Sequence, residues 1–445
     1  MAPPPCRHPR SWQKLSALAA LSLFSTAVTA ISAECSIEAS CNRERDFGAL
    51  FLVPYAFYNS STEFAGAVAF GATGYLQPQL DIVVNGFVSA NGSSSGFMMF
   101  KDYQIGGAGS RWFLDSILMR NDLTEIKSYR DGNPDFPDDD AGSNDSDQDN
   151  FLYVEGTDTL VLPTFRYLLP IGHGRQQPIH TFRLDQGLLE PGSEAGGDVW
   201  NPLESGRTTL EIEPFYRKQD FTLTNDSNGA SAQQSAGIRL RLKYDNTDWS
   251  KNPGYGSNTE IAIRRDWGQS ADSPSWTQIE FEYSKYVPLP SSGARQRVVA
   301  INAWVSDVPT WNSYDRENDQ QIFHRPPVFA GSTLGGLDRQ RGFESYRFND
   351  RSAVNYQLEY RHIPYANPLG NWSLLQQLQI KWMQYVLFAE LGRVNDRFDI
   401  TALHRDMRLS AGAGLRLNAM GLVVRADVAV SNEGGQLQMF VGHTF

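Results

Sequence analysis

The sequence lacks features that several large classes of protein need. It has 445 residues, of which 41% are hydrophobic, and its mean hydropathy is −0.40. A single long apolar run, near the N-terminus, is too little for a bundle of membrane helices, each of which needs about 20 apolar residues. Three cysteines are too few for a disulfide-dense scaffold, and aromatics at 12% with charged residues at 20% argue against disorder. A large soluble protein or a membrane β-barrel remains, because strands that alternate look polar on average.

Metal-binding and catalytic patterns are scarce as well. The chain has seven histidines, and none stands in a ligand pattern such as His-Glu-x-x-His. No spacing of Ser, His and Asp supports a hydrolase triad. We therefore predict no catalytic residue, no metal site, no cofactor and no enzymatic activity. The Asp-rich stretch 131–150 could offer oxygen ligands to calcium, but its spacing departs from the EF-hand, which favours a solvated external loop.

The N-terminus has the layout of a secretory signal peptide. Arg7, Arg10 and Lys14 precede the apolar stretch Leu15–Ala33, and cleavage could follow Ala30 or the end of that stretch. A membrane anchor is the alternative. Removing residues 1–33, which hold these three basic residues and no acid, takes the formal charge from −11 to about −14. An acidic exported protein is a poor nucleic-acid binder, so we predict no nucleic-acid partner. Cys35 and Cys41 would remain, and a small disulfide loop between them is plausible in an oxidising compartment.

The rest of the chain alternates with a period of two, which is typical of strands with two different faces. Ile238–Asp245 places Ile, Leu, Leu and Tyr on one face and Arg, Arg, Lys and Asp on the other, and residues 353–361 and 407–417 repeat the pattern. Segments of about 10–13 residues suit tilted strands that cross a bilayer. Polar faces with both charge signs and aromatics near segment ends suit a lumen and an interfacial girdle. We predict an all-β transmembrane antiparallel barrel, with a soluble β-sandwich as the alternative.

We predict about sixteen strands, an even number that places both ends of the sheet on one side of the membrane. We expect the sheet to close, because closure would remove the open edges that leave backbone groups unsatisfied in lipid. The expected strands begin near Phe47, Glu63, Leu80, Ser95, Arg111, Asp158, Arg207, Ala236, Asn258, Ser275, Arg295, Ser352, Trp382, Arg405, Gly421 and Gly435.

This count predicts a signal peptide at 1–33, a short periplasmic segment at 34–46 and a barrel at 47–445. The long connections at 122–157, 220–235 and 307–351 would be external. The stretch 170–206 would fall on the periplasmic side, where turns are usually short, so it would hold strand extensions or a plug.

The last residues suggest a barrel assembly signal at Phe445. Alternation predicts one shared face for Leu437, Met439, Val441, His443 and Phe445. A terminal aromatic on such a strand resembles the outer-membrane sorting signature. An ordinary edge strand is the alternative.

One constellation in the C-terminal half points to a family. Residues 329–343 read Phe-Ala-Gly-Ser-Thr-Leu-Gly-Gly-Leu-Asp-Arg-Gln-Arg-Gly-Phe, Leu358–Arg361 read Leu-Glu-Tyr-Arg, and Phe388–Gly392 read Phe-Ala-Glu-Leu-Gly. This order resembles the BamA/TamA superfamily of outer-membrane barrels, also called bacterial surface antigen barrels. Asp245, Asp248 and Pro253-Gly254 also look like a pattern of that family.

The resemblance implies a long external loop that folds back into the lumen, with Arg341, Gly342 and Phe343 at its tip. The arginine would meet the carboxylates of neighbouring strands, here Glu359 and Glu390, with Gly392 completing the second strand's motif. The family usually has Asp where this chain has Glu390. Alternation independently places both glutamates on the polar faces of their strands. The alternative is that Arg341 is an exposed loop arginine that contributes almost nothing to stability.

The resemblance also implies a function and a location. We expect a stand-alone barrel without POTRA modules, in the cell outer membrane, that assists insertion or translocation of protein or lipid. Its partners would be outer-membrane lipid and a protein or lipid cargo, with no POTRA-mediated partner. The alternatives are a passive channel or structural surface protein without transport activity, and a barrel lipid hydrolase or acyltransferase.

Overall fold

The structure is a computed structural model. It describes residues 49–445 except for 60–62, 131, 198, 225, 270–273, 316–317, 370–379 and 420. The predicted signal peptide, the segment 34–46 and the three cysteines lie outside the described residues. The described part contains no helix that is long and apolar enough to cross a bilayer.

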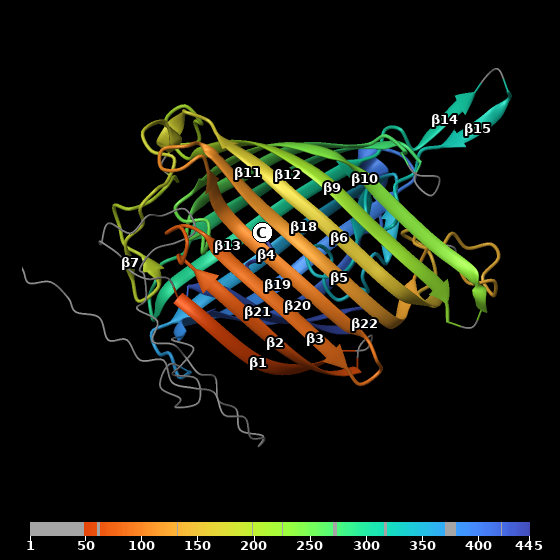
Figure 1. Cartoon of the computed structure of the whole chain (residues 1–445), viewed down its shortest axis with the longest axis horizontal. Coiled ribbons are helices and arrows are strands. Elements are labelled where there is room, and N and C mark those ends of the chain that lie inside the picture. The colour runs from red at the N-terminus through yellow and green to blue at the C-terminus, as the bar shows by residue number, and fades with distance from the viewer. Residues whose placement is uncertain are drawn as a thin grey trace, which may run out of the picture.

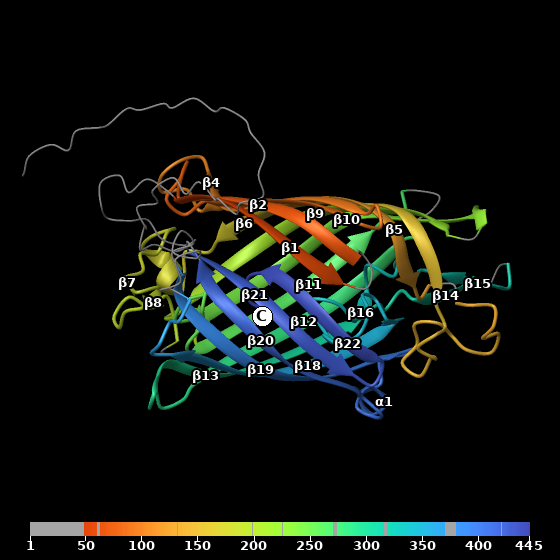
Figure 2. The same cartoon turned by 90° about the horizontal axis from the view of Figure 1, so that it is seen from below.

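Sixteen antiparallel strands form one sheet that follows the order of the chain and curls into a barrel (Figures 1 and 2). The predicted all-β antiparallel barrel of sixteen strands is therefore confirmed. The strands are β1 (Ala49–Asn59), β2 (Glu63–Thr73), β3 (Asp81–Ser89), β4 (Ser94–Ile105), β5 (Trp112–Ser128), β6 (Leu152–Leu168), β9 (Arg207–Leu223), β10 (Asp226–Thr247), β11 (Gly256–Asp266), β12 (Trp276–Pro288), β13 (Ala294–Asp307), β18 (Ser352–Pro364), β19 (Ile380–Asn395), β20 (Arg408–Ala419), β21 (Leu422–Ser431) and β22 (Gly434–Val441).

Most strands begin within a few residues of the predicted positions, and two begin well before them. Strand β6 begins at Leu152 rather than near Asp158, and β10 begins at Asp226 rather than near Ala236. The early part of β10, residues 226–235, is polar and small and does not alternate. It pairs with the far end of β9 through backbone hydrogen bonds, which do not depend on side-chain pattern.

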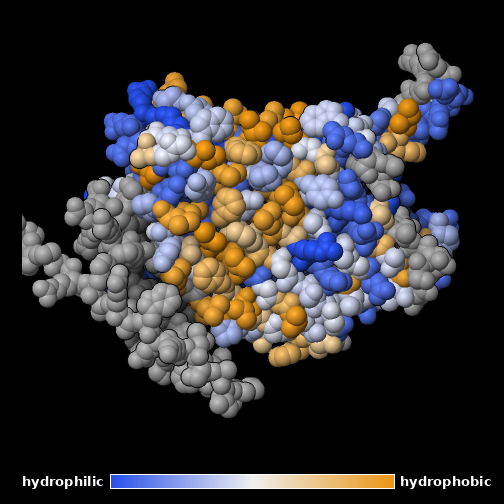
Figure 3. Space-filling model, in the orientation of Figure 1, coloured by the Kyte–Doolittle hydropathy of each residue, from blue (hydrophilic) through white to orange (hydrophobic). Residues whose placement is uncertain are grey.

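The two faces of the strands separate as alternation predicts. Leu240, Leu358 and Leu387 point outward with exposed fractions of 46%, 50% and 60%, whereas Glu359 and Glu390 are fully buried inside. Apolar side chains gather over the outer faces of the strands that face the viewer in Figure 3. This outer surface suits the hydrocarbon core of a bilayer.

The two edge strands of the sheet are β1 and β22, which we call the seam. The sheet order starts with β1 and finishes with β22, and the described residues contain no β-pairing between the two. Strand β22 has 8 residues, fewer than the 11 of β1. Both strands therefore carry edge backbone groups without a strand partner among the described residues.

The chain also forms shorter elements in its long connections. At the end of the barrel where β1 begins and β22 finishes, here called the terminal end, lie η1 (Gly172–Arg175), β7 (Leu184–Asp185) and β8 (Leu188–Leu189). At the opposite, loop end, β14 (Asn312–Asp315) and β15 (Gln320–Phe323) project away from the barrel in Figure 1, and α1 (Ile400–Leu403) joins β19 to β20. Strands β16 (Ser332–Leu334) and β17 (Phe348–Asp350) pair with each other.

The last residues correct one expectation. Strand β22 stops at Val441, and Gly442 takes a φ of +105°, a left-handed conformation that favours glycine. The chain then turns into the lumen, where the ring of Phe445 lies 6.3 Å from that of Tyr286 on β12. The predicted shared face for residues 437–445 is therefore wrong beyond β22. The role of Phe445 as an assembly signal stays a prediction.

The Asp-rich loop is less solvated than expected. Its Asn144 and Ser146 are buried. The Asn144 carbonyl accepts from Arg408, and Arg347 donates to Ser146 Oγ at 2.8 Å. The described residues hold no group of three or more acidic, histidine or cysteine side chains placed to bind a metal ion. The loop lies over the loop end of the barrel and is tied to its wall.

Candidate functional site: a buried charge cluster in the lumen

The connection between β13 and β18 returns into the barrel as residues 332–350, here called the lumen loop. Strands β16 and β17 pair at its base, so the tip residues between them reach into the lumen. Gly335 and Gly336 have φ values of +107° and +103°. The amide of Gly336 donates to the carbonyl of Phe343 at 3.3 Å, which closes the tip. The double glycine therefore supplies a turn that other residues would adopt only with strain.

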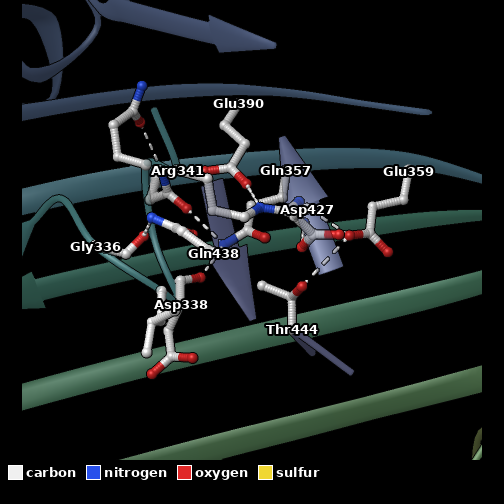
Figure 4. A network of polar contacts seen from close by, with 12 residues as sticks. Gly336, Asp338, Arg341, Gln357, Glu359, Glu390, Asp427, Gln438 and Thr444 are labelled. Atoms are coloured by element: carbon white, nitrogen blue, oxygen red, sulfur yellow. Dashed lines mark hydrogen bonds and ion pairs between the residues drawn. The ribbon is translucent and has the colours of Figure 1, made fainter. Parts of the chain in front are cut away.

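Arg341 lies at this tip, fully buried, and contacts three carboxylates (Figure 4). Its Nε donates to Glu390 at 2.5 Å, and its backbone amide donates to the other oxygen of the same group at 2.8 Å. One Nη donates to Glu359 at 2.9 Å, and the other donates to Asp427 at 2.7 Å. The fork of the guanidinium therefore joins β18, β19 and β21, as its planar donors allow.

The structure brings the sequence-predicted residues together around Arg341. The guanidinium stacks 3.6 Å from the ring centre of Phe388. Gly342 has a φ of +92°, and its carbonyl accepts from Ser431 Oγ at 2.8 Å. Phe343 is 1% exposed and packs edge-on against Phe348. These contacts fill the space around the ion pairs with apolar groups.

Gly392 leaves room for the tip. A Cβ at this position would lie 2.4 Å from Oε1 of Gln340, a fully buried side chain. Gln340 donates to the carbonyl of Arg408 at 2.8 Å and accepts from Asn355 at 2.9 Å, so it cannot easily move away. A side chain at Gly392 would displace the residue next to Arg341.

Further charges complete the cluster. Glu359 also binds Arg416, at 2.7 and 2.8 Å, and Arg361, at 2.8 Å. Arg341, Arg361 and Arg416 thus face Glu359, Glu390 and Asp427 in the interior, where unpaired charges would be costly. Burial alone lowers the pKa of Arg341, but the three carboxylates outweigh it and raise that pKa above the ordinary value. Arg341 therefore stays charged.

Sequence reasoning missed two parts of this cluster. Asp427 lies on the polar face of β21, two residues from Arg425, and alternation alone could have placed it inside. The inward turn after β22 was not foreseen. There His443 Nδ1 lies 2.7 Å from Arg416, Thr444 bonds Arg425, and the carbonyl of Phe445 accepts from Arg361.

Side chains from two strands also hold the tip from outside the charge cluster. Gln438 on β22 donates to the carbonyl of Gly336 at 3.1 Å, and Gln357 on β18 donates to that of Asp338 at 2.8 Å. Both appear in Figure 4 beside Arg341. The tip is therefore bonded to β22 at the seam as well as to the strands next to it.

Residues 199–445 match the family model for the Omp85 superfamily domain. The chain belongs to the Omp85 superfamily. The matched region runs from just before β9 to the last residue and contains the whole charge cluster. The resemblance to BamA/TamA barrels is thereby confirmed. The described residues of this Omp85 barrel contain no separate folded module beside the barrel.

Several solved structures are similar. They include BamA from Haemophilus ducreyi lacking POTRA domains 1–3 (13% identity, TM-score 0.43, 90% of this chain and 70% of that one). CdiB from Acinetobacter baumannii also matches, with 11% identity and a TM-score of 0.47 over 88% of this chain and 58% of that one. CdiB from Escherichia coli matches with 11% identity and a TM-score of 0.49 over 88% of this chain and 61% of that one. The chain thus spans less than two thirds of either CdiB chain. No curated protein sequence matches the chain significantly.

The terminal end of this Omp85 barrel is crossed by residues 169–206, which we call the plug segment. Leu188 packs against Ile363, Trp382 and Val423 of β18, β19 and β21, although the segment itself connects β6 to β9. Trp382 Nε1 donates to the carbonyl of Gly187 at 2.6 Å. Of the two interpretations left open for this stretch, strand extension or plug, these contacts favour a plug.

The turn between β10 and β11 supports the plug segment. Trp249 packs against Phe182 and Ala195, and Lys251 reaches Asp81 on β3 at 3.1 Å. Asp248 Oδ1 accepts from the backbone amides of Trp249 and Gly254, both at 2.9 Å, and of Tyr255 at 3.3 Å. A Cβ on Gly254 would lie 2.7 Å from the other oxygen of this carboxyl. The Asp and Pro-Gly pattern found in the sequence therefore shapes this turn.

We expect the stability of this turn to fall as the pH rises. Burial raises the pKa of Asp248 to about 7, although the three amides act against it. An ordinary Asp titrates near 4, so between these values the folded state binds the proton more tightly than the unfolded state. Below about pH 4 the protonated carboxyl does not destabilise the fold. Between about pH 4 and 7 the free energy of unfolding falls, in total by on the order of a few kcal/mol.

Asp248→Asn provides the check, because asparagine keeps the accepting oxygen and removes the charge. Hydrogen exchange at the Gly254 and Tyr255 amides should be slower in the variant than in the wild type at pH 8, and similar in both at pH 5, after correction for intrinsic exchange. Equal protection in both proteins at pH 8 would contradict a charged, buried Asp248.

Proposed function

We propose that this Omp85 barrel resides in the outer membrane, with its terminal end toward the periplasm, and assists insertion or translocation of a protein or lipid. The observation that carries the proposal is the seam. In the described residues, β1 and β22 are the two edges of the sheet and do not pair with each other. Such an edge can accept another strand or part sideways at little cost in hydrogen bonds.

The charge cluster supports the same proposal. Arg341 joins β18, β19 and β21, the last of which pairs with β22. We propose that it acts as a lock, which keeps this wall in shape while the neighbouring edge moves. A barrel that opens at one edge needs the strands beside that edge to stay folded, because lipid cannot satisfy their backbone groups.

Disulfide crosslinking of the seam tests lateral opening. With the native cysteines replaced by serine, cysteine pairs would be scanned between residues 52–57 of β1 and 435–440 of β22. We expect pairs that crosslink efficiently to abolish function in a complementation assay, and a reductant to restore it, because the proposed path runs between these strands.

A matched control pair lies on strands that are already hydrogen-bonded. Ile261 on β11 and Phe281 on β12 stand opposite each other in register and point outward. A disulfide between cysteines at these two positions should leave function intact. Full activity with a locked seam would exclude lateral opening. The proteins and lipids that change in the outer membrane of a deletion strain would identify the cargo.

A passive channel is the second candidate, and one observation favours it. A cavity of about 680 Å³ lies in the lumen beside the lumen loop. A barrel that serves as a channel should show large, steady pores in a planar bilayer. A barrel closed by its plug segment and lumen loop should be nearly silent.

We further propose that the barrel is not an enzyme. Residues 92–96 read Gly-Ser-Ser-Ser-Gly, a nucleophile-elbow spacing, but they lie in the β3–β4 hairpin, where no helix follows. Ser275 Oγ lies 3.1 Å from His324 Nδ1, and this nitrogen also lies 2.9 Å from the Ser275 carbonyl. Because a ring nitrogen next to a carbonyl donates its proton, it is poorly placed to activate the serine. Labelling by a serine-directed probe would contradict this proposal.

A further inference from the structure

The lumen cavity lies along β4–β12, beside the lumen loop. With a volume of about 680 Å³, it is of the size that holds small-molecule ligands. Its wall is rich in basic side chains, which come from β4, β9, β10 and β11: Lys101, Arg217, Arg239, Arg241, Lys243 and Arg264.

Four of these basic side chains are neutralised by carboxylates nearby. The pairs are Arg217 with Asp158 at 2.6 Å, Arg239 with Glu280 at 3.1 Å, Arg241 with Glu211 at 2.5 Å and Lys243 with Glu260 at 3.2 Å. They form an ordinary network of ion pairs in a polar lumen, and no ligand is needed to explain them.

Arg264 and Lys101 differ from the other four. Within the described residues, neither forms an ion pair or a hydrogen bond through its side chain. Asp81, the register partner of Lys101, pairs with Lys251 instead. The Nε of Arg264 is buried without an acceptor, and its guanidinium lies 5.4 Å from the ring centre of Phe215.

The position of Arg264 adds to its cost. It stands directly opposite Arg239 in the β10–β11 register, where two like charges destabilise the sheet. Glu280 attracts both arginines, but its ion pair is with Arg239, so a single carboxylate serves two cations there. A donor that is buried without an acceptor costs free energy on folding, so the Nε of Arg264 needs an explanation. Lys101 is exposed to the cavity and adds a second cation without an ion-pair partner among the described residues.

We propose that the lumen cavity binds a phosphate-bearing ligand through Arg264 and Lys101. A phosphate monoester carries between one and two negative charges at neutral pH, which matches two cations without partners. The guanidinium fork of Arg264 can donate two parallel hydrogen bonds to phosphate oxygens, and the ammonium of Lys101 supplies a point charge. The proposal does not depend on whether the barrel translocates cargo.

Titration calorimetry on the purified full chain, in a non-ionic detergent and a phosphate-free buffer, tests the proposal. The probes are inorganic phosphate and dihexanoyl phosphatidate. We expect at least one of them to bind the wild-type protein. Arg264→Gln and Lys101→Gln should each weaken that binding by roughly tenfold or more, because each removes a charged hydrogen-bond donor.

Arg265→Gln is the matched control. It makes the same change one residue along β11, on the opposite face of the strand, where Arg265 donates to Thr277 at 2.8 Å. Its affinity should equal that of the wild type. Neither Arg264→Gln nor Lys101→Gln breaks an ion pair, so both variants should keep the heat-modifiable mobility of a folded barrel.

The two probes also distinguish the source of the phosphate. Binding of inorganic phosphate as tight as that of phosphatidate would assign the site to a free phosphate. Binding of phosphatidate alone would assign it to a lipid headgroup, and both outcomes support the proposal. Binding of neither probe to the wild type, or equal affinity in the wild type, Arg264→Gln and Lys101→Gln, would overturn it.

Discussion

Arg341→Ala is expected to lower the free energy of unfolding by about 3–5 kcal/mol, the usual cost of removing one partner from a buried ion pair. The wild-type guanidinium serves Glu390, Glu359 and Asp427 at once, and all four side chains are buried. Alanine would leave Glu390 without the one cation that it pairs with in the described residues, whereas Glu359 would keep Arg416. The lumen loop should then leave the wall, and less barrel should fold.

Heat-modifiable gel mobility and the yield of folded barrel are the measurements. Arg351→Ala is a suitable control. Arg351 lies at the end of the same β13–β18 connection, but it is partly exposed and pairs with Asp307 at 3.2 Å. That pair should contribute about 1 kcal/mol or less. Unchanged mobility and yield in Arg341→Ala would refute the lock, whatever the control shows.

Arg341→Lys separates charge from geometry. Lysine keeps the positive charge but has a single ammonium, which cannot donate in the fixed directions of a guanidinium. We expect an intermediate yield of folded barrel, because one carboxylate would be served and the others would lose their donors. A yield equal to that of the wild type would mean that charge alone holds the loop.

Removing the tip of the plug segment should open the terminal end to ions. Replacing residues 181–196, which include β7 and β8, by a short Gly-Ser linker deletes the contacts of Leu188 with the far wall and the hydrogen bond from Trp382. The lumen loop is bonded to β18–β22 and also reaches β12 through Arg339 and β9 through Tyr346, and the cavity lies beside it. We expect this cavity to become continuous with the terminal end. Planar-bilayer recordings should change from nearly silent to large, steady currents.

Deletion of the β14–β15 hairpin, residues 312–323, is the control for this experiment. It removes a similar length of chain from a hairpin that projects away from the barrel at the loop end (Figure 1). Its conductance should match that of the wild type. If the wild-type barrel already conducts as well as the 181–196 deletion, the plug segment is not the barrier.

Much of the fold could be predicted because a barrel wall is a local pattern repeated many times. Alternation indicates which face of each strand meets lipid, and Glu359 and Glu390 lie inside as the pattern requires. Most strands begin within a few residues of the point where apolar alternation begins in the sequence. The early half of β10 could not be predicted in this way, because residues 226–235 are held by the backbone of β9 rather than by a face of apolar side chains.

The contacts between distant segments were harder to predict. Leu188 and Trp382 meet although they are far apart in the chain, and no periodicity of either segment indicates the other. Alternation could have placed Asp427 on the inward face of its strand. Its hydrogen bond with Arg341 could not be predicted without knowing where the lumen loop runs. The turn at Gly442 depends on the left-handed backbone conformation of this glycine. It also depends on Arg416 and Arg425, which bind His443 and Thr444 inside the lumen.

The inward turn of the last residues has a practical consequence for anyone who purifies this barrel. An affinity tag fused after Phe445 would start inside the pore, between Tyr286 and Arg361, rather than in the surrounding buffer. It would have to thread past a row of guanidinium groups or pull the tail out. An epitope inserted into the β14–β15 hairpin would leave that interior untouched and should be captured far more readily.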